Sequence, residues 1–352
     1  MNIGLPKESK EGERRVALLP EAVATLVAPG ARVLVETCAG MGVGANDEAY
    51  RAAGARIVTA DEAWRADVVV KVKEIQEADL AHLPDGAALF SFQHLPGEPA
   101  RTRELAARHA TAIAFEMVRD ARGGFPLLAP MSQIAGRMAL QQAARLLGRA
   151  PRQVLVLGAG HAGLSAAAEA KRMGAQVVVL TRSARSCDEA KARGFEADIA
   201  LPQRIEEEAL EAEVVVGAVF LAATPTPKLL PRSLVSRMLR GSVIADISID
   251  AGGVAETSHP TTHADPSFVE EGVIHYCVAN IPAAAPAEAA AALSAAVLPY
   301  VQAIASLGLG PALLADPGLR AGVLLWRGGV NHPGIAAEAG LPYTALADDD
   351  LR

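Results

Sequence analysis

The stretch Val154-Leu155-Val156-Leu157-Gly158-Ala159-Gly160-His161-Ala162-Gly163 decides the fold of this chain. Its four apolar residues predict a buried strand, its glycines predict a tight turn, and the following run from Leu164 to Met173 predicts a helix. Gly158 allows the turn, Gly160 lets a ligand approach the backbone, and Gly163 lets helix and strand pack closely. Because free N–H groups at a helix start bind phosphate, this strand–turn–helix unit is typical of dinucleotide binding.

Strand and helix signals alternate along the rest of the chain. We expect helices at 20–28, 131–147 and 287–307, and strands at 2–5, 32–36, 66–72, 87–92, 111–115, 176–180, 214–216, 242–246 and 273–277. This alternation predicts an α/β fold with two Rossmann-like, doubly wound parallel-sheet domains, joined by long helices and with a cleft between them. Taking the two long helices as connectors, we expect a discontinuous substrate or catalytic domain at 1–128 plus 287–352. The dinucleotide-binding domain would then span 129–286.

The composition of the 352 residues is that of a globular protein, with 51% hydrophobic and 21% charged residues. A formal net charge of −7 argues against a nucleic-acid binder, which would carry a basic face. The three cysteines, Cys38, Cys187 and Cys277, lack the spacing of metal ligands or of a disulfide framework, so no metal site is expected. No signal peptide is recognisable, and proline or polar residues interrupt the apolar runs well short of a membrane span. We therefore expect a cytoplasmic protein without a membrane partner.

The end of the strand at 176–180 bears on the choice of cofactor. An NAD-binding unit is expected to carry a carboxylate for the adenosine ribose there, but this chain has Thr181, Arg182 and Ser183, with Arg185 close behind. Without the acid, repulsion against a ribose 2′-phosphate is removed, and Arg182 or Arg185 could pair with that phosphate. NADP(H) is therefore favoured, and NAD(H) is possible if the arginines are merely solvated.

Polar residues that could carry chemistry follow other predicted elements. Either Arg14 or Arg15 could bind a substrate carboxylate, although both could also lie in a solvated turn. Lys71 and Lys73 follow an apolar strand, and the alternation of side chains does not choose between them. His94 follows the strand at 87–92. Residues at the carboxyl ends of parallel strands face the ligand crevice of open α/β sheets, so these side chains are candidates for catalysis.

Two aspartates precede the glycine turn at 252–253. Asp246 ends a predicted strand and Asp250 lies four residues later, so they are alternative active-site carboxylates. Because a buried unpaired carboxylate is costly, we expect one of them to meet a charged partner or a ligand.

Over nearly its whole length the chain resembles the alanine dehydrogenase and pyridine nucleotide transhydrogenase N-terminal family, and most closely its alanine dehydrogenases. The resemblance rests on ordered segments at matching spacing, which are 3–8, 14–20, 71–74, 128–132, the glycine turn, 246–253 and 276–282. It implies an oxidoreductase that reversibly deaminates L-alanine, or a similar small L-amino acid, to pyruvate or another 2-oxo acid and ammonium, with NAD(P) as acceptor. It also implies a homo-oligomer, specifically a hexamer.

The resemblance assigns roles to individual residues. Arg15 would bind the substrate carboxylate, Lys73 would bind its carboxylate or carbonyl, and His94 and Asp250 would be the catalytic pair. The expected cofactor-binding residues, including those of the strand end discussed above, are Ser132, Gly158, Gly160, His161, Ala162, Gly163, Thr181, Arg182, Ser183, Arg185, Val219, Phe220, Ile247, Ile249, Val278, Ala279, Asn280 and Ile281.

Two other functions are compatible with parts of this pattern. An NADPH-dependent opine-type reductase would condense a 2-oxo acid with the amine of an amino acid, as carboxyethyl-ornithine-synthase-like enzymes do. A nucleotide-sensing or lens-type binding protein would keep the fold and lose at least one of Arg15, Lys73, His94 and Asp250. Retention of His94 and of the segments 129–132 and 278–280 favours the dehydrogenase over the reductase, and the presence of all four residues favours it over the binding protein.

Overall fold

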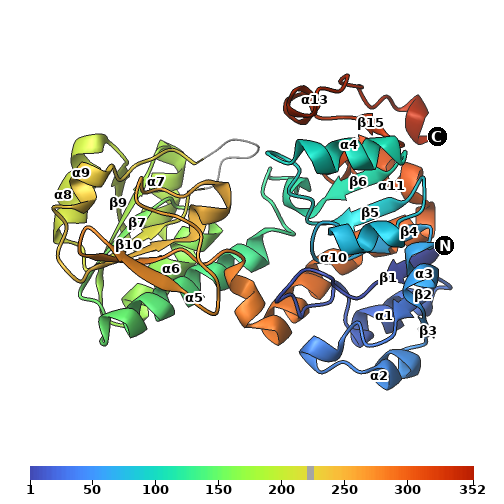
Figure 1. The fold of residues 1–352 in the computed structure, drawn as a ribbon, viewed down its shortest axis with the longest axis horizontal. Coiled ribbons are helices and arrows are strands. Elements are labelled where there is room, and N and C mark those ends of the chain that lie inside the picture. Colours follow the sequence, from blue (N-terminus) through green and yellow to red (C-terminus); the bar gives the residue numbers. More distant parts are fainter. Residues whose placement is uncertain (220–225) are drawn as a thin grey trace. The chain divides into compact units, whose positions relative to one another are not determined.

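The computed structural model describes residues 1–219 and 226–352, and these form two compact units (Figure 1). Unit 1 contains residues 1–130 and 285–352, and unit 2 contains residues 131–284. The domain boundaries predicted from the sequence lie between residues 128 and 129 and between residues 286 and 287. Each unit contains its own α/β sheet, so the prediction of a two-domain Rossmann-like architecture is confirmed.

Unit 1 is built on an eight-stranded sheet with the order β15-β14-β6-β5-β4-β1-β2-β3. The strands from β1 to β6 pair in parallel, as predicted. The sheet also has an antiparallel edge, β14 and β15, that was not predicted, because a hairpin needs only a short turn and carries no crossover helix as a signal. The strands are β1 Asn2–Leu5, β2 Arg32–Glu36, β3 Arg56–Val58, β4 Val68–Val70, β5 Ala88–Ser91, β6 Thr111–Ala114, β14 Val323–Trp326 and β15 Gly329–Val330.

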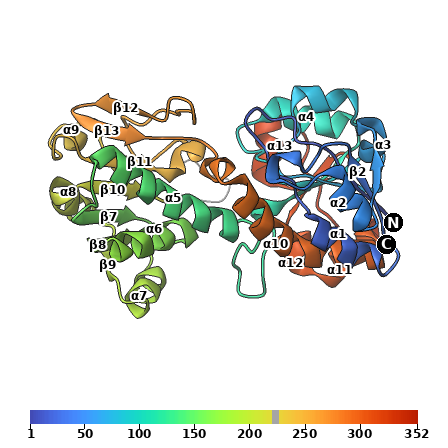
Figure 2. The same ribbon diagram turned by 90° about the horizontal axis from the view of Figure 1, so that it is seen from below.

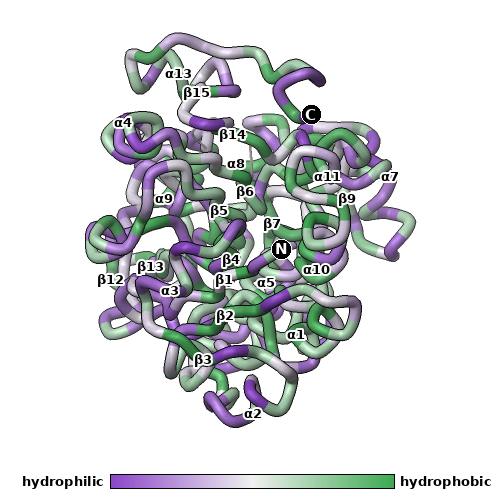
Figure 3. The backbone as a smooth tube through the Cα atoms, turned by 90° about the vertical axis from the view of Figure 1, so that its right-hand side faces the viewer, coloured by the Kyte–Doolittle hydropathy of each residue, from purple (hydrophilic) through white to green (hydrophobic). Residues whose placement is uncertain are grey.

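Helices cover both faces of this sheet. Figure 2 shows α1, α10, α11 and α12 on one side of unit 1 and α3, α4 and α13 on the other. Hydrophobic residues predominate along the central strands, whereas the peripheral helix α2 is mostly hydrophilic (Figure 3). The helices are α1 Pro20–Val27, η1 Met41–Val43, α2 Asp47–Ala52, α3 Ala60–Trp64, η2 Glu77–Ala81, α4 Pro99–Ala107, η3 Phe115–Met117, α10 Pro286–Leu307, α11 Leu309–Ala315, α12 Pro317–Arg320, α13 Pro333–Ala339 and η6 Asp349–Leu351.

Helix α10 is the most apolar of the long helices in the described residues. By length and composition alone it could cross a membrane, with a mean hydropathy of 1.6, which the sequence expectation did not anticipate. Pro299 lies inside the helix, as the predicted range 287–307 implies. One face of α10 packs into unit 1, and the Leu19 N–H donates to the Ser294 hydroxyl at 2.9 Å. This packing is typical of a core helix.

Unit 2 contains a seven-stranded sheet with the order β12-β13-β11-β10-β7-β8-β9, in which only the edge strand β12 is antiparallel. The strands are β7 Gln153–Leu157, β8 Gln176–Thr181, β9 Glu196–Ile199, β10 Val214–Gly217, β11 Val243–Asp246, β12 Ser267–Glu270 and β13 Val273–Tyr276. The helices are α5 Ala129–Leu147, which begins at the end of unit 1, and then α6 His161–Arg172, α7 Ala184–Ala192, α8 Pro202–Glu211, α9 Arg232–Val235, η4 Ile247–Ala251 and η5 Ile281–Ala284.

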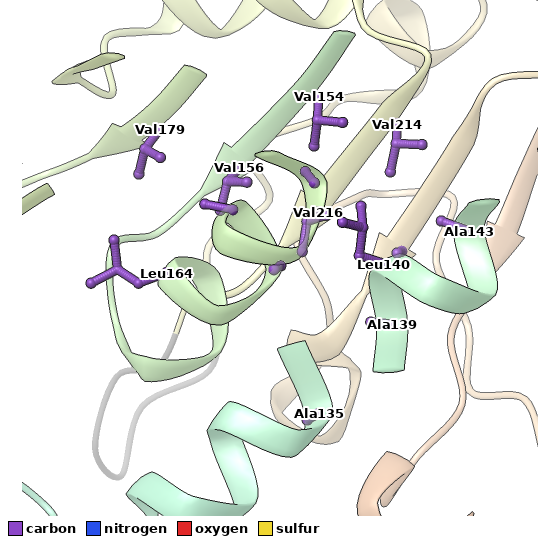
Figure 4. Close-up of a cluster of buried hydrophobic side chains, with 14 of the residues drawn as sticks. Ala135, Ala139, Leu140, Ala143, Val154, Val156, Leu164, Val179, Val214 and Val216 are labelled. Atoms are coloured by element: carbon purple, nitrogen blue, oxygen red, sulfur yellow. The ribbon is translucent and has the colours of Figure 1, made fainter. Parts of the chain in front are cut away.

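The alternating side chains of β7 build the two cores of unit 2. Val154 and Val156 pack with α5 and α6 (Figure 4), whereas Leu155 and Leu157 pack with α8 and α9. A strand covered on both faces must be apolar at every position, which is why this segment is a continuous apolar run. The strand that leads into the glycine turn is therefore held by hydrophobic packing on both faces of the sheet.

Candidate active site

The glycine turn lies where the strand order of unit 2 reverses. From β7 the chain builds β8 and β9 on one side and β10, β11 and β13 on the other. Ligands of open α/β sheets bind outside the carboxyl ends of the strands at such a reversal. The Gly158 N–H donates to the Leu180 carbonyl and the Ala218 N–H to the Leu157 carbonyl, so the turn is attached to the ends of both neighbouring strands.

Each glycine of the turn has a geometric reason. Gly158 has a φ of 108°, and a Cβ there would lie 2.4 Å from the Ala218 carbonyl oxygen. A Cβ at Gly163 would lie 1.9 Å from the Gly158 carbonyl oxygen. At Gly160 a Cβ would meet no described atom within 4 Å, although Gly160 has an ordinary φ of −79°. Gly158 and Gly163 are therefore required by the protein itself, whereas the space beside Gly160 is open to a ligand.

The end of β8 contains the residues on which the cofactor prediction rests. Thr181 is buried, and the Ser183 hydroxyl caps α7 by accepting from the Ser186 N–H at 3.0 Å. Arg185 is exposed and pairs with Glu189 on the same helix at 3.0 Å, whereas Arg182 is exposed beside the strand end. Of the two predicted phosphate partners, Arg182 is therefore the better placed, because Arg185 already has a carboxylate.

The ends of β10 and β11 meet through a short contact. The Val219 N–H donates to the Ser248 hydroxyl at 2.8 Å, which ties the segment after β10 to η4. Ile247 is half-buried and Ile249 is buried in η4. Phe220, predicted as a cofactor contact, lies outside the described residues.

The structure separates the two candidate aspartates. Asp246 is fully buried, and its carboxylate accepts from the Val254 N–H at 2.8 Å and the Ser258 hydroxyl at 2.7 Å. Burial raises its pKa, although these hydrogen bonds oppose the shift. Asp250 is exposed at the end of η4. Asp246 thus holds the turn that follows it, and Asp250 is the carboxylate accessible to a substrate.

The remaining predicted cofactor residues differ in their exposure. His161 is exposed at the first position of α6, Ala162 is half-buried behind it, and Ser132 is half-buried in the first turn of α5. Ala279 and Asn280 are half-buried, and Asn280 has a left-handed φ of 55°. The side chains of Val278 and Ile281 pack into the core of unit 2, so only their backbone could contact a ligand.

In unit 1, Lys73 and His94 also follow the carboxyl ends of neighbouring strands. Lys73 comes after β4 and His94 after β5, and the strand order reverses between β4 and β1. The Lys73 ammonium lies 6.0 Å from the centre of the Phe92 ring, and that ring stacks on the His94 imidazole at 5.9 Å. The structure therefore brings both predicted residues close to the Phe92 ring.

Lys71 and Lys73 have different environments, which the sequence could not show. Strand β4 ends at Val70, two residues earlier than expected. The Lys71 ammonium is fully buried, 2.7 Å from Asp79 and 3.7 Å from Glu8. Lys71 is thus a structural cation between two carboxylates, and Lys73 is the lysine associated with His94.

Arg15 is buried rather than displayed in a solvated turn. Its guanidinium donates to Glu13 through Nε at 2.7 Å and through Nη2 at 2.5 Å, and Glu13 is also buried. Glu13 contributes to the raised pKa of the nearby Glu8 carboxyl. The fork of Arg15 is therefore held in a fixed orientation by a carboxylate that the sequence reasoning did not single out.

Charges around His94 shape its titration. Desolvation lowers the pKa of His94, as does the positive charge of Lys73, while Glu74 opposes the shift. Because the His94 side chain is also in contact with solvent, water moderates this shift. Burial would raise the pKa of Glu74, but the charge of Lys73, together with the hydrogen bond and charge of Lys10, lowers it to about 2. Near neutral pH the site thus combines a neutral imidazole with an ionised carboxylate.

Four carboxylates of this site were missed from the sequence: Glu8, Glu13, Glu74 and Glu116. Charged residues near the ends of predicted strands were the only available signal, and that signal is shared by many solvated residues. Only burial marks them as part of the site, since each has at most 9% of its surface exposed.

Comparison with known proteins agrees with this arrangement. The C-terminal domain model of the alanine dehydrogenase/PNT family matches residues 129–333, and the N-terminal domain model matches residues 4–135. The alanine dehydrogenase of Halomonas elongata is 40% identical to this chain, with 99% of each chain covered.

Another sequence and a solved structure extend the comparison. The alanine dehydrogenase of Bacillus subtilis is 38% identical, covering 99% of this chain and 98% of that one. A solved structure of an L-alanine dehydrogenase superposes with a TM-score of 0.89 at 38% identity, covering 96% of this chain and 98% of the other. This chain belongs to the alanine dehydrogenase/PNT family.

Proposed function

We propose that this protein is an amino-acid dehydrogenase that reversibly converts L-alanine to pyruvate and ammonium with a nicotinamide cofactor. The observation that carries the proposal is the full-length similarity to alanine dehydrogenases, which extends across both units. The placement of Lys73 and His94 at adjacent strand ends supports it, because deamination needs a cation for the carboxylate and a group that exchanges protons.

The residues of unit 1 supply binding and proton transfer in this proposal. Arg15 and Lys73 hold the carboxylate and the carbonyl oxygen of the substrate. His94 is neutral near pH 7, so it accepts a proton from the water that attacks the substrate iminium and returns a proton to the departing amine. Asp250, from unit 2, is the proposed second catalytic residue, with its exposed carboxylate holding the ammonium and orienting the water.

The glycine turn fits the pyrophosphate of a dinucleotide, because the space beside Gly160 is open and α6 begins there without a side-chain cap. A bound nicotinamide would supply the hydride acceptor that oxidation of the amino acid at its α-carbon requires. The protein contributes the orientation of the substrate and the movement of its protons.

The finer choice of cofactor is also a proposal. We infer a preference for NADP(H), because Thr181 brings no negative charge to the end of β8 and Arg182 is exposed beside it. The test compares kcat/KM with NADPH and NADH in the wild type, in Arg182→Ala, and in Arg193→Ala at the other end of α7. Arg182→Ala should lower kcat/KM with NADPH more than with NADH, whereas Arg193→Ala should leave the ratio of the two unchanged. A wild-type preference for NADH would refute the inference.

The reaction itself is tested with purified protein, by following pyruvate plus ammonium in one direction and alanine in the other. His94→Ala should abolish turnover while cofactor binding, measured by nicotinamide fluorescence, survives. Normal turnover in this variant would remove His94 from the mechanism. A panel of 2-oxo acids and amines covers the opine-type alternative, to which the relatives described above give no support.

Assembly and cellular location extend the proposal. We propose a homo-oligomer, specifically a hexamer, which sedimentation or light scattering would measure directly. We also propose a cytoplasmic location, supported by three free cysteines that suit a reducing compartment.

A further inference from the structure

Two buried carboxylates hold the backbone of the segments that carry Lys73 and His94. Glu116 follows β6 and accepts from the His94 N–H at 2.8 Å and from the Gln93 N–H at 3.1 Å. Glu8 follows β1 and accepts from the Val72 N–H at 2.6 Å and the Lys73 N–H at 3.2 Å. In the order β6-β5-β4-β1, the two outer strands thus supply an acceptor to the ends of the two inner ones.

The backbone of His94 needs such support. Its φ of 44° lies in the left-handed region, which side chains other than glycine rarely adopt. A residue stays in this conformation only when its surroundings enforce it. Glu116 is the acceptor described for both N–H groups of this bend, and it is buried with 8% of its surface exposed.

We propose that Glu116 is a positioning residue that fixes the direction of the His94 imidazole through the backbone, and that Glu8 does the same for Lys73. This inference rests on the proposed function of His94 and Lys73. The carboxylates act as acceptors rather than as proton donors to a substrate. Charge attraction between Glu116 and Lys73 is the competing explanation. Burial raises the pKa of Glu116, and the positive charge of Lys73 partly opposes this shift.

Variants of Glu116 separate the two explanations. Glu116→Gln keeps an oxygen at the same reach, so it can still accept from both N–H groups, but it removes the charge. Glu116→Asp keeps the charge and withdraws the acceptor by one methylene. Glu116→Ala removes both. Because a misplacement of about 1 Å can cost 100-fold in rate, we expect kcat to fall about 10- to 100-fold in Glu116→Ala and Glu116→Asp. In Glu116→Gln it should stay within about threefold of wild type, and the KM for the cofactor should be unchanged in all three.

A second readout does not depend on turnover. The His94 imidazole resonance, identified by its loss in His94→Ala, should shift in Glu116→Ala and Glu116→Asp and stay in place in Glu116→Gln. Glu169→Ala is the matched control, because it removes a buried carboxylate of unit 2 that binds Arg172 and Gln141. It should leave the His94 resonance unmoved even if it lowers the melting temperature.

The possible outcomes decide the proposal. If Glu116→Asp keeps kcat and the His94 resonance while Glu116→Gln loses them, charge is the role of Glu116 and the positioning proposal is wrong. Unchanged kcat and resonance in folded Glu116→Ala would also overturn it. If Glu116→Ala does not fold, the comparison of kcat and the His94 resonance between Glu116→Gln and Glu116→Asp gives the same decision. A wild type without alanine or pyruvate turnover would defeat the proposed function, whereas the resonance would still test the positioning.

Discussion

Replacing Gly163 by alanine tests the close packing at the glycine turn. Gly163 lies in the first turn of α6, and its added Cβ would be 1.9 Å from the carbonyl oxygen of Gly158. The same Cβ would lie 3.1 Å from a methyl carbon of Val156. The oxygen belongs to the backbone, so no side-chain rotation relieves the clash. Helix α6 must instead move away from β7 or the turn must open.

The expected cost follows from this geometry. A carbon–oxygen contact is comfortable at about 3.3 Å, so the backbone must separate by about 1.4 Å. Overpacked sites in proteins typically cost about 1–3 kcal/mol, and a clash between two backbone segments belongs at the upper end. At about 2–4 °C for each kcal/mol in a domain of this size, a cost of about 3 kcal/mol lowers the melting temperature of unit 2 by about 6–12 °C.

Gly160→Ala is the matched control. Gly160 has an extended backbone that alanine adopts, and its Cβ would meet no described atom, so the melting temperature should stay within about 2 °C of wild type. That Cβ would enter the space proposed for the pyrophosphate, so cofactor affinity should fall at least about 10-fold. Thermal unfolding by circular dichroism and a fluorescence titration measure the two effects.

The pair of variants is informative because stability and binding should separate. A Gly163→Ala protein with wild-type melting temperature would show that the close approach of α6 and the turn is not needed. A Gly160→Ala protein with wild-type cofactor affinity would contradict the location of the pyrophosphate. Loss of stability in Gly160→Ala and not in Gly163→Ala would refute the reasoning altogether.

Two further predictions concern buried charge. Replacing Lys71 by methionine removes the cation 2.7 Å from Asp79, so we expect the free energy of unfolding, measured with urea, to fall by about 3–5 kcal/mol. The double variant with Asp79→Leu should recover part of this loss. A loss below about 1 kcal/mol would contradict the buried pair. Burial lowers the pKa of His275, whose ring contacts the Thr257 hydroxyl at 2.7 Å. The neutral form of His275 therefore stabilises the fold fully above about pH 6.5, and this contribution is lost as the pH falls below that value. The free-energy difference between wild type and His275→Gln should therefore shrink from pH 7.5 to pH 5, and a constant difference would be inconsistent with a buried neutral His275.

Local patterns were sufficient to predict much of the fold. The apolar run of β7 and the glycines after it predicted strand, turn and helix, because each signal depends on backbone sterics and burial within a few residues. The same holds for the long helices α5 and α10, which begin within two residues of the expected positions. The antiparallel edges and the short helices escaped prediction because they depend on neighbours rather than on their own periodicity.

The sequence by itself determined the fold class, the position of the nucleotide-binding turn and the residue types available for chemistry, since these follow from local preferences along the chain. Only the tertiary structure decided that Lys71 is buried between carboxylates while Lys73 stands beside Phe92, and that Asp246 holds a turn while Asp250 is exposed. It alone brought Glu116 to the backbone of His94, 22 residues away. The physical reason is that strand order sets which distant residues meet, and burial then selects the charges that need a partner.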